Sequence, residues 1–369
     1  MTVAAPAGQR VRIVGTGLIG TSLGIALARK GFQVSLADPS PTAAALARDL
    51  GAGVLATDKA GPPDVIVVAA PPDVVAEVVV TELSQWPDAV VTDVASVKGA
   101  VLAALQARGL DLSRYVGSHP MAGREKSGAM AAQGDLFEGR SWVVAPGPQA
   151  SAKAIDTVRL IAEAAGSVVL VMTPAEHDAA VAAVSHVPQI AASLVASRLR
   201  DLSSGAVALS GQGVRDVTRI AASDPGMWTQ ILAGNAPAVR DVLERLAQEL
   251  EAVLVALRHL ELDPGEGSVG ARAVLARTVA DGNAGHALIP GKHGAAPTTY
   301  ATVVVVVPDE PGSVGRLLHD VGEAGVNMED LHLDHAVGQP FGLAELSVLP
   351  AAVRPLMSAL SAQGWTVHE

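Results

Sequence analysis

The chain has 369 residues, enough for two or three domains, and 49% of them are apolar. Its formal net charge of −11 at pH 7 argues against a surface that binds nucleic acid or an anionic membrane. Because it has no cysteine, it has no disulfide, thiolate metal site or thiol nucleophile. Residues 1–9 lack the charged and apolar segments of a signal peptide, and no uncharged apolar run reaches membrane-spanning length. We therefore expect a cytoplasmic protein.

The first forty residues carry a dinucleotide-binding pattern. A predicted strand at Arg10–Val14 runs directly into Gly-x-Gly-x-x-Gly, which is followed by a helix pattern to about Lys30. A second strand at Gln33–Ala37 then ends on an acid. The glycine motif alone is a weak signal, but in this strand–helix–strand setting it indicates a Rossmann-type cofactor site. The predicted cofactor-binding residues are Gly15, Gly17, Leu18, Ile19, Gly20 and Asp38.

Each part of this pattern has a physical role. Gly15 permits the tight turn, Gly17 lets a pyrophosphate approach the backbone, and Gly20 lets helix and strand pack closely. The amide groups at the helix start favour a phosphate. Asp38 would accept hydrogen bonds from ribose hydroxyls and repel a 2′-phosphate, and no arginine follows before Arg48, so NAD is favoured over NADP. The alternative is a glycine-rich turn without a ligand.

Strand and helix patterns continue to alternate up to residue 172, which predicts a mostly parallel, doubly wound sheet. Ligands of such sheets bind beyond the carboxyl ends of the strands. The segments 15–20, 93–98 and 117–128 all follow predicted strands, so we expect them to face one crevice. Predicted strands lie at 64–69, 89–91, 115–117, 141–145 and 167–172, and predicted helices lie at 71–83 and 150–165.

The segment 117–128 reads GSHPMAGREKSG and combines one histidine with an acid, two bases and two serines. Its proline and glycines predict a loop rather than a regular buried strand or helix. His119 is its only side chain that titrates near neutral pH unaided, so we interpret it as a proton acceptor near the nicotinamide, although a packing or capping role is the alternative. Ser96 is placed beside it, or else it is the N-cap of the following helix.

A capping box with proline at the first helical position begins at Thr173, and the pattern is helical from there to about residue 281. Pro188 should kink the first long helix beside His186, which either faces the crevice or belongs to the core. Arg215 and Arg219 lie four apart on one predicted helix face among apolar residues. A semi-buried guanidinium of this kind suits a substrate carboxylate, and a solvated surface is the alternative.

The rest of the chain is organised around a long helix and a small C-terminal module. The apolar stripe of the helix at 237–262 indicates subunit packing, and 264–299 is interpreted as a linker with one short helix. Residues 301–369 follow a βαββαβ order. His332 and His335 are three apart on a strand and point to opposite faces, and no other cluster has ligand spacing, so we predict no metal.

These motifs resemble those of the prephenate dehydrogenase family over nearly the whole chain. They are 15–20, 92–99 (TDVASVKG), 117–128, 185–188 (SHVP) and 215–228 (RDVTRIAASDPGMW). The resemblance implies that His119 is the catalytic histidine, with Ser96 as its polar partner. It also implies a substrate-binding set of Arg219, His186, Ser118 and Glu125, with Glu125 at the site's entrance. Arg124 departs from the small hydroxyl residue of many relatives.

The resemblance further implies an NAD-binding domain at 1–172, a helical substrate and dimerisation domain at 173–281, a linker at 282–299 and an ACT-like regulatory domain at 300–369. We expect a homodimer. ACT-like modules bind an amino acid at the first strand–helix turn, so L-tyrosine is the expected effector, unless it binds the active site as a substrate mimic. The expected regulatory residues are Pro311, Gly312, Ser313 and Asn327.

The implied reaction converts prephenate to 4-hydroxyphenylpyruvate by hydride transfer to NAD⁺ and loss of CO₂. Arogenate, with an ammonium in place of the keto group, is the alternative substrate, and Asp216 is the nearest acidic candidate for recognising it. A β-hydroxyacid dehydrogenase would need a helical-domain lysine, and none lies between Lys153 and Lys292. A non-catalytic nucleotide and amino-acid sensor is the remaining alternative.

Overall fold

The computed structural model describes residues 8–57, 61–122, 128–262, 269–289, 300–335 and 340–369. Its contacts divide the chain into two compact units, residues 1–250 and 251–369.

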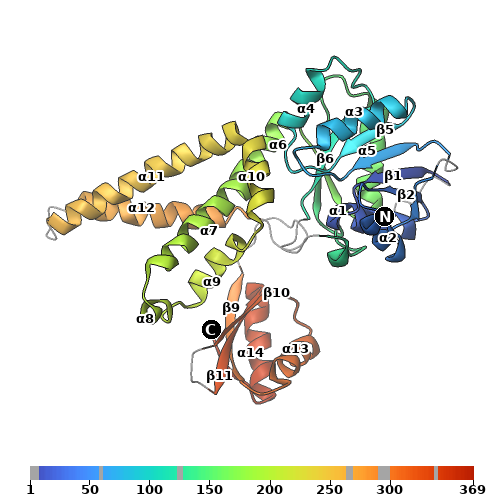
Figure 1. Ribbon diagram of the computed structural model, residues 1–369. Coiled ribbons are helices and arrows are strands. Elements are labelled where there is room, and N and C mark those ends of the chain that lie inside the picture. Colours follow the sequence, from blue (N-terminus) through green and yellow to red (C-terminus); the bar gives the residue numbers. More distant parts are fainter. Residues whose placement is uncertain (1–7, 58–60, 123–127, 263–268, 290–299, 336–339) are drawn as a thin grey trace. The chain divides into compact units, whose positions relative to one another are not determined.

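The described part of the first unit contains one eight-stranded sheet with the order β3-β2-β1-β4-β5-β6-β7-β8 (Figure 1). All neighbouring strands are parallel except β6 and β7, which are antiparallel. The predicted mostly parallel, doubly wound sheet is therefore confirmed. The strands are β1 Arg10–Val14, β2 Gln33–Ala37, β3 Val54–Leu55, β4 Val65–Val68, β5 Val90–Asp93, β6 Tyr115–Pro120, β7 Ser141–Ala145 and β8 Val168–Val171.

Helices cover both faces of this sheet because its central strands are apolar on both sides. In β4, Val65 and Val67 pack into one core cluster with α1 and α5, whereas Ile66 and Val68 pack into a second cluster with α3 and α4. This alternation follows from the two-residue period of a strand. The helices are α1 Leu18–Arg29, α2 Pro41–Asp49, α3 Val75–Gln85, α4 Gly99–Gln106 and α5 Ala152–Ala164.

The segment 117–128 corrects one expectation. Its first four residues are not a loop: they continue strand β6, where His119 pairs with Val143 and Pro120 with Trp142 of the antiparallel β7. Pro120 is tolerated because it is the last residue of the strand. A Cβ on Gly117 would lie only 3.1 Å from Cδ of Lys98, so the Lys98 side chain occupies the space that a larger residue at position 117 would need. His119 is consequently carried by a rigid element.

The helical part of the first unit begins with the predicted capping box, in which Thr173 and Glu176 cap each other at the start of α6. The predicted irregularity at Pro188 is present as a π-helical turn, Ala182–His186, between α6 and α7. The helices of this part are α6 Pro174–Val181, α7 Val187–Arg198, α8 Ser204–Val207, α9 Gln212–Thr218, α10 Pro225–Gly234 and α11 Ala236–Leu262, the last of which extends into the second unit.

The continuous helical stretch Pro174–Asp201 is long and apolar enough to cross a membrane by length and composition, with 33% of its most apolar window buried. Sequence inspection missed it because a few charged residues interrupt the run. His177, Asp178 and His186 on this stretch are hydrogen-bonded to other parts of the first unit. Such contacts are typical of a core helix in a folded domain.

In the second unit, the interpretation of 264–299 as a linker with one short helix is wrong over most of the described part. Residues Val269–His286 form α12, a helix of 18 residues. Its frequent alanines favour helix strongly enough to offset its glycines.

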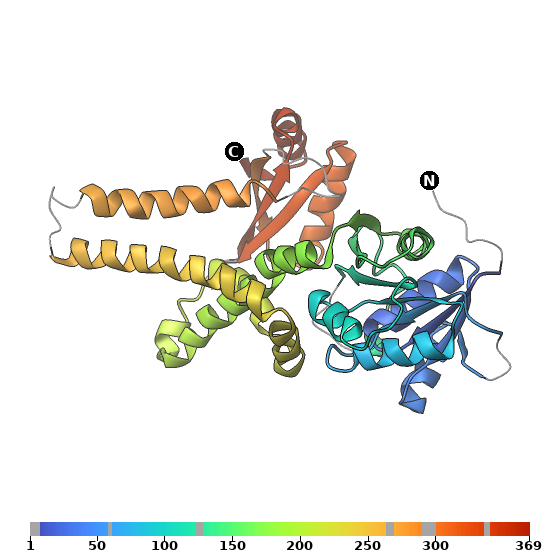
Figure 2. The ribbon, with the colours of Figure 1, turned by 90° about the horizontal axis from the view of Figure 1, so that it is seen from above.

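The C-terminal residues form the predicted βαββαβ order. The strands are β9 Ala301–Pro308, β10 Met328–His335, β11 Phe341–Val348 and β12 Thr366–His368, and the helices are α13 Ser313–Glu323 and α14 Val353–Ala362. The described strands make an antiparallel sheet with the order β10-β11-β9-β12. Both helices pack on one face of it (Figure 1, Figure 2), where Val305, Leu317 and Leu356 are among the fully buried side chains.

Candidate active site

The glycine motif forms a tight turn between β1 and α1. Gly15 has φ of 100°, and a Cβ there would lie 2.3 Å from the carbonyl oxygen of Ala69 on the neighbouring chain segment. A Cβ on Gly20 would lie 1.9 Å from the carbonyl oxygen of Gly15. No atom lies within 4 Å of a Cβ position on Gly17, so this part of the turn is open. The two outer glycines thus serve packing, and the middle one leaves room for a ligand.

The start of α1 can accept an anion. Gly17 is its N-cap and supplies no side-chain hydrogen bond, and the first turn contains no acidic residue. Asp38 lies at the end of the neighbouring β2, where its Oδ2 accepts hydrogen bonds from the amide of Thr16 at 2.7 Å and its hydroxyl at 2.9 Å. Its Oδ1 accepts one from the amide of Ser40 at 2.8 Å. The carboxylate is therefore held beside the glycine turn, as a dinucleotide site requires.

His119 lies at the same edge of the sheet as the glycine turn. The strands β1, β4, β5 and β6 are consecutive and parallel, so their carboxyl ends share one edge. Three strand spacings separate the turn after β1 from His119 on β6, roughly 14 Å at 4.8 Å per strand. An extended dinucleotide anchored at the turn spans that distance.

His119 is the first member of a hydrogen-bonded chain of side chains. Its Nδ1 lies 2.9 Å from Nε2 of His177, and Nδ1 of His177 lies 2.8 Å from Oδ1 of Asp178. His119 is partly exposed, whereas His177 is fully buried. Burial, followed by the nearby charges of His177, Lys98 and His186, holds the pKa of His119 well below its ordinary value. His119 is consequently neutral at pH 7.

Asp178 connects this series of hydrogen-bonded side chains to the start of α4 in the nucleotide-binding domain. Its Oδ1 accepts a hydrogen bond from the amide of Lys98 at 2.9 Å, and its Oδ2 accepts one from the amide of Gly99 at 2.8 Å. Burial alone would raise the pKa of Asp178, but the hydrogen bonds from His177 and these amides outweigh it, so the pKa is lowered. The carboxylate is therefore ionised.

A buried ionic network lies near His119. The Lys98 ammonium, 1% exposed, pairs with the Asp93 carboxylate, which is fully buried. The Tyr115 hydroxyl donates to Asp93 Oδ2 at 2.7 Å, and the amide of Ala95 donates to Oδ1 at 2.9 Å. Burial lowers the pKa of Lys98, and burial together with the Asp93 charge raises the pKa of Tyr115 well above its ordinary value. The Lys98 ammonium of this network is close enough to His119 to contribute to the lowered pKa of the histidine.

His186 lies at the end of the π-helical turn and is 1% exposed. Its Nδ1 lies 3.1 Å from Nδ2 of Asn235, and its ring meets the edge of Trp228 with centroids 6.1 Å apart. Burial lowers the pKa of His186 to about 4. It is near the His177–Asp178 pair but does not reach the surface, so its contact with substrate stays a prediction.

Two of the predicted serines differ in their surroundings. Ser118 is fully buried, donates a hydrogen bond to the carbonyl oxygen of Asp93 at 2.8 Å and accepts one from the Thr92 hydroxyl at 3.1 Å. Because neighbouring strand residues point to opposite faces, Ser118 lies on the face opposite to His119, and its contact with substrate stays a prediction. Ser96 is half-buried, and the hydrogen bonds around it are made by Asp93 and Lys98 instead, so its role stays a prediction.

The structure also differs from the prediction that Arg215 and Arg219 share one semi-buried helix face. Helix α9 ends at Thr218, and Arg219 begins the 3-10 turn Arg219–Ala221, so Arg215 and Arg219 are not on one α-helix. Both side chains are exposed rather than semi-buried. Asp216 accepts a hydrogen bond from Gln212 at 2.8 Å. Glu125 and Arg124 lie outside the described residues.

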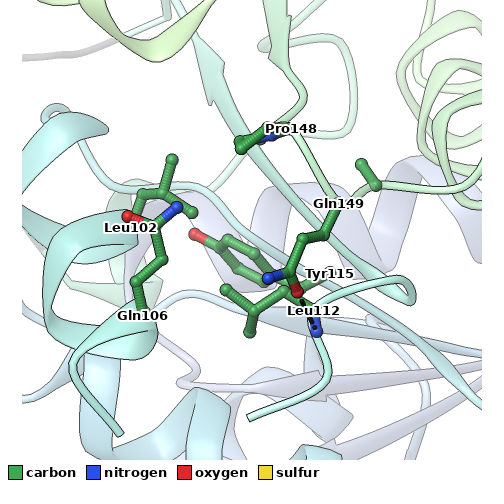
Figure 3. A pocket seen from close by; sticks show the side chains of 8 residues that line it. Leu102, Gln106, Leu112, Tyr115, Pro148 and Gln149 are labelled. Atoms are coloured by element: carbon green, nitrogen blue, oxygen red, sulfur yellow. Dashed lines mark hydrogen bonds between the residues drawn. The ribbon is translucent and has the colours of Figure 1, made fainter. Parts of the chain in front are cut away.

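Figure 3 shows a small hollow beside Tyr115. Leu102 and Gln106 of α4 and Pro148 and Gln149 of the loop after β7 line it, and the Gln149 side chain accepts a hydrogen bond from the amide of Leu112. The hollow is too narrow for a ligand, and the Tyr115 hydroxyl is already bound to Asp93. It is distinct from the candidate site. Among the described residues, no group of three or more acids and histidines is arranged to hold a metal ion.

The model of the nucleotide-binding domain of prephenate dehydrogenase matches residues 23–171, and the model of the dimerization domain of prephenate dehydrogenase matches residues 173–264. The chain belongs to the prephenate dehydrogenase family. The probable prephenate dehydrogenase NovF of Streptomyces niveus is 37% identical over 359 residues, which cover 96% of this chain and 98% of that protein. The prephenate dehydrogenase of Lactococcus lactis subsp. cremoris is 28% identical over 343 residues, which cover 88% and 92% respectively.

Solved structures of the family agree. The prephenate dehydrogenase from A. aeolicus in complex with hydroxyphenyl propionate and NAD⁺ has a TM-score of 0.65 and 29% identity, over 76% of this chain and 99% of that chain. The Synechocystis arogenate dehydrogenase, at 24% identity and a TM-score of 0.62, shares the fold. The family assignment and the Rossmann-type and helical domains predicted from the sequence are confirmed.

Sequence reasoning missed several residues of this prephenate dehydrogenase family site. His177 and Asp178 follow the capping box, which was interpreted only as a helix start. Asp93 and Lys98 belong to a quoted motif, and the rarity of two opposite charges within a buried apolar stretch is the signal that could have singled them out. Asn235, between α10 and α11, has no local signal at all.

Proposed function

We propose that this protein catalyses the NAD⁺-dependent oxidative decarboxylation of prephenate to 4-hydroxyphenylpyruvate. One observation carries the assignment of the chemistry: a neutral, partly exposed histidine, His119, is held on a rigid strand at the edge of the sheet that carries the dinucleotide turn. The family membership supplies the substrate class.

NAD⁺ supplies the hydride acceptor, and the residues of the first domain fit it. The open face at Gly17 and the uncapped start of α1 suit its pyrophosphate, and Asp38 suits its adenosine ribose hydroxyls. Leu18 and Ile19 contribute the first amides of that helix.

His119 acts as base and then as acid. It takes the proton of the C4 hydroxyl while the C4 hydride leaves to NAD⁺, so the C–O bond becomes a carbonyl. Loss of the C1 carboxylate as CO₂ leaves its electron pair in the ring, which becomes aromatic, and the former carbonyl oxygen becomes a phenolate. The proton held by His119 then returns to that oxygen, so no net proton is consumed.

Arg219 is the proposed ligand of a substrate carboxylate, because a guanidinium can bind a carboxylate through two hydrogen bonds. His186 is the proposed second substrate contact. Ser96 and Glu125 complete the set as the partner of His119 and a residue of the entrance.

The deciding experiment measures NADH formation with prephenate and with arogenate, and compares kcat/KM. We expect prephenate to be preferred. If arogenate is preferred, the proposed mechanism stands but the substrate is arogenate. If neither compound gives NADH, the proposal is overturned.

A homodimer is also proposed, formed through the helical domain. Leu246, Leu250, Leu254 and Leu257 of α11 are 39–56% exposed. Their spacing places them on one side of the helix, as expected for a subunit interface. The family's description of residues 173–264 as a dimerization domain supports this proposal.

The C-terminal βαββαβ module is proposed to be an ACT-like domain that binds L-tyrosine. Gly312 has φ of 93° and is the N-cap of α13 without a side-chain hydrogen bond, so the amides at this helix start suit a carboxylate. Pro311 and Asn327 are exposed, and Ser313 is half-buried. A site at this turn fits an amino-acid effector.

A further inference from the structure

We propose that His177 and Asp178 are positioning residues that fix the ring of His119 in one tautomer, with the proton on Nδ1 and the bare Nε2 available to the substrate hydroxyl. The inference rests on the proposed function, in which His119 is the base. It concerns two side chains, fully buried and nearly so, that lie 58 and 59 residues beyond His119 in the chain.

The tautomer follows from the end of the hydrogen-bonded chain. Asp178 is ionised and can only accept, so Nδ1 of His177, 2.8 Å away, must carry a proton. His177 is fully buried, and burying a charged ring costs more than burying a neutral one, so we infer that it carries this one proton only. Nε2 of His177 is therefore bare and accepts, so the proton between the two histidines, 2.9 Å apart, belongs to Nδ1 of His119.

The carboxylate of Asp178 is held in position by backbone hydrogen bonds. Its two oxygens each accept one backbone amide, from Lys98 and Gly99 at the start of α4. A Cβ on Gly99 would lie 2.7 Å from Asp178 Oδ2, so any larger residue at this position would force the carboxylate to shift. The backbone carbonyl of Asp178 in turn accepts a hydrogen bond from Asn235 Nδ2 at 2.8 Å. The orientation of His177 is thus set by both the nucleotide-binding sheet and the helical domain.

The same series of hydrogen bonds also stabilises the charged form of His119. When Nε2 takes the substrate proton, His119 becomes a cation whose Nδ1–H donates to His177 Nε2, and the Asp178 carboxylate stabilises the charge through the second ring. When the phenolate oxygen forms, Nε2 returns its proton and the original tautomer is restored. Neither His177 nor Asp178 exchanges a proton with the substrate.

Two replacements of His177 separate positioning from simple packing. His177→Gln retains an oxygen that can accept from His119 Nδ1–H, whereas His177→Phe retains a ring of similar size without an acceptor. We expect His177→Phe to lower kcat about 10–100-fold with KM for prephenate within about 3-fold, and His177→Gln to recover most of that loss. His259→Phe, at an exposed position of α11, is the matched control and should leave kcat unchanged.

The tautomer is measured directly by ¹⁵N NMR of histidine-labelled full-length enzyme with NAD⁺ bound, with the His119 signals assigned from His119→Asn. We expect a protonated Nδ1 and a bare Nε2 in the parent and in His177→Gln, and a mixture in His177→Phe. A protonated Nε2 in the parent, or an unchanged tautomer and kcat in His177→Phe, would overturn the inference. Full activity of His119→Asn would instead remove His119 as the base while leaving the measured tautomer valid, so the two failures are distinguishable. The parent spectrum decides the matter even if His177→Phe does not fold.

Discussion

Nδ2 of Asn235 donates one hydrogen bond to the backbone carbonyl of Asp178 at 2.8 Å and a second to Nδ1 of His186 at 3.1 Å. The carbonyl can only accept, so the orientation of the amide is determined and Nδ1 of His186 must be bare. His186 therefore carries its proton on Nε2 and presents a donor. A neutral donor suits an oxygen of the substrate, and burial keeps it neutral.

The pKa of His186 predicts how stability depends on pH. It is about 4 in the folded protein and 6.5 ordinarily, so between these values the unfolded chain binds a proton that the folded chain does not. The free energy of unfolding should therefore fall as the pH is lowered from 7 to 5, and the lowered pKa of His119 adds to the effect. Urea titrations at pH 7 and 5 measure this decrease in the free energy of unfolding. The decrease should be smaller in His186→Gln, and an equal decrease in parent and variant would contradict the lowered pKa of His186.

Replacing His119 should remove the base. His119→Asn is expected to lower kcat by roughly 10²–10⁴-fold, while the affinity for NAD⁺ stays within a few-fold, because the dinucleotide is held mainly at the glycine turn. Because the pKa of His119 is depressed, kcat/KM of the parent should hold its pH 7 value to below pH 6.5. Near-normal turnover of the variant would show that another group accepts the proton.

Asp38 should determine the choice of cofactor. The parent is expected to prefer NAD⁺ over NADP⁺, and Asp38→Ser should narrow the difference in kcat/KM by removing the repulsion of a 2′-phosphate. Thr16 loses a hydrogen-bond acceptor in this variant, so Thr16→Val, which loses one of the two bonds and keeps the charge, is the matched control. A parent that uses both cofactors equally would contradict this role of Asp38.

Arg219 should contribute to substrate binding. Arg219→Ala is expected to lower kcat/KM for prephenate, mainly by raising KM, because a charge-assisted contact to a carboxylate is lost. The decrease should correspond to about 2–4 kcal/mol of lost transition-state stabilisation. Arg215→Ala, four residues earlier and also exposed, is the control that should change KM little. Steady-state kinetics measures both. Unchanged KM and kcat in Arg219→Ala would make this arginine a surface residue only.

Removal of residues 300–369 should separate regulation from catalysis. The residues proposed for catalysis lie in the first unit, so the shortened chain is expected to form NADH from prephenate while inhibition by L-tyrosine weakens. The inhibition constant is measured for both chains. The same constant in the shortened chain would mean that tyrosine binds at the active site, as a substrate mimic held by Arg219.

Local patterns in the sequence were sufficient for most of the fold. The glycine turn, the capping box at Thr173 and the βαββαβ order depend on neighbouring residues, and the structure has each where it was expected. Where two local tendencies compete, the sequence was insufficient. Gly117 and Pro120 weaken a strand, but pairing with β7 and the close approach of Lys98 favour one. In α12, alanine outweighs glycine.

The candidate site depends on contacts between distant residues. His119 could be recognised from its own segment, because a titratable side chain after a strand has a local signature. Its connection to His177 and Asp178 could not, because residues 58 and 59 positions apart meet only when α6 packs against the start of α4. The pairing of buried Lys98 with Asp93 has the same cause. The sequence by itself determined which elements form and where the cofactor turn lies. Tertiary packing alone decided which polar groups are removed from water together, and hence which of the three histidines of the first unit's site is neutral, oriented and partly exposed.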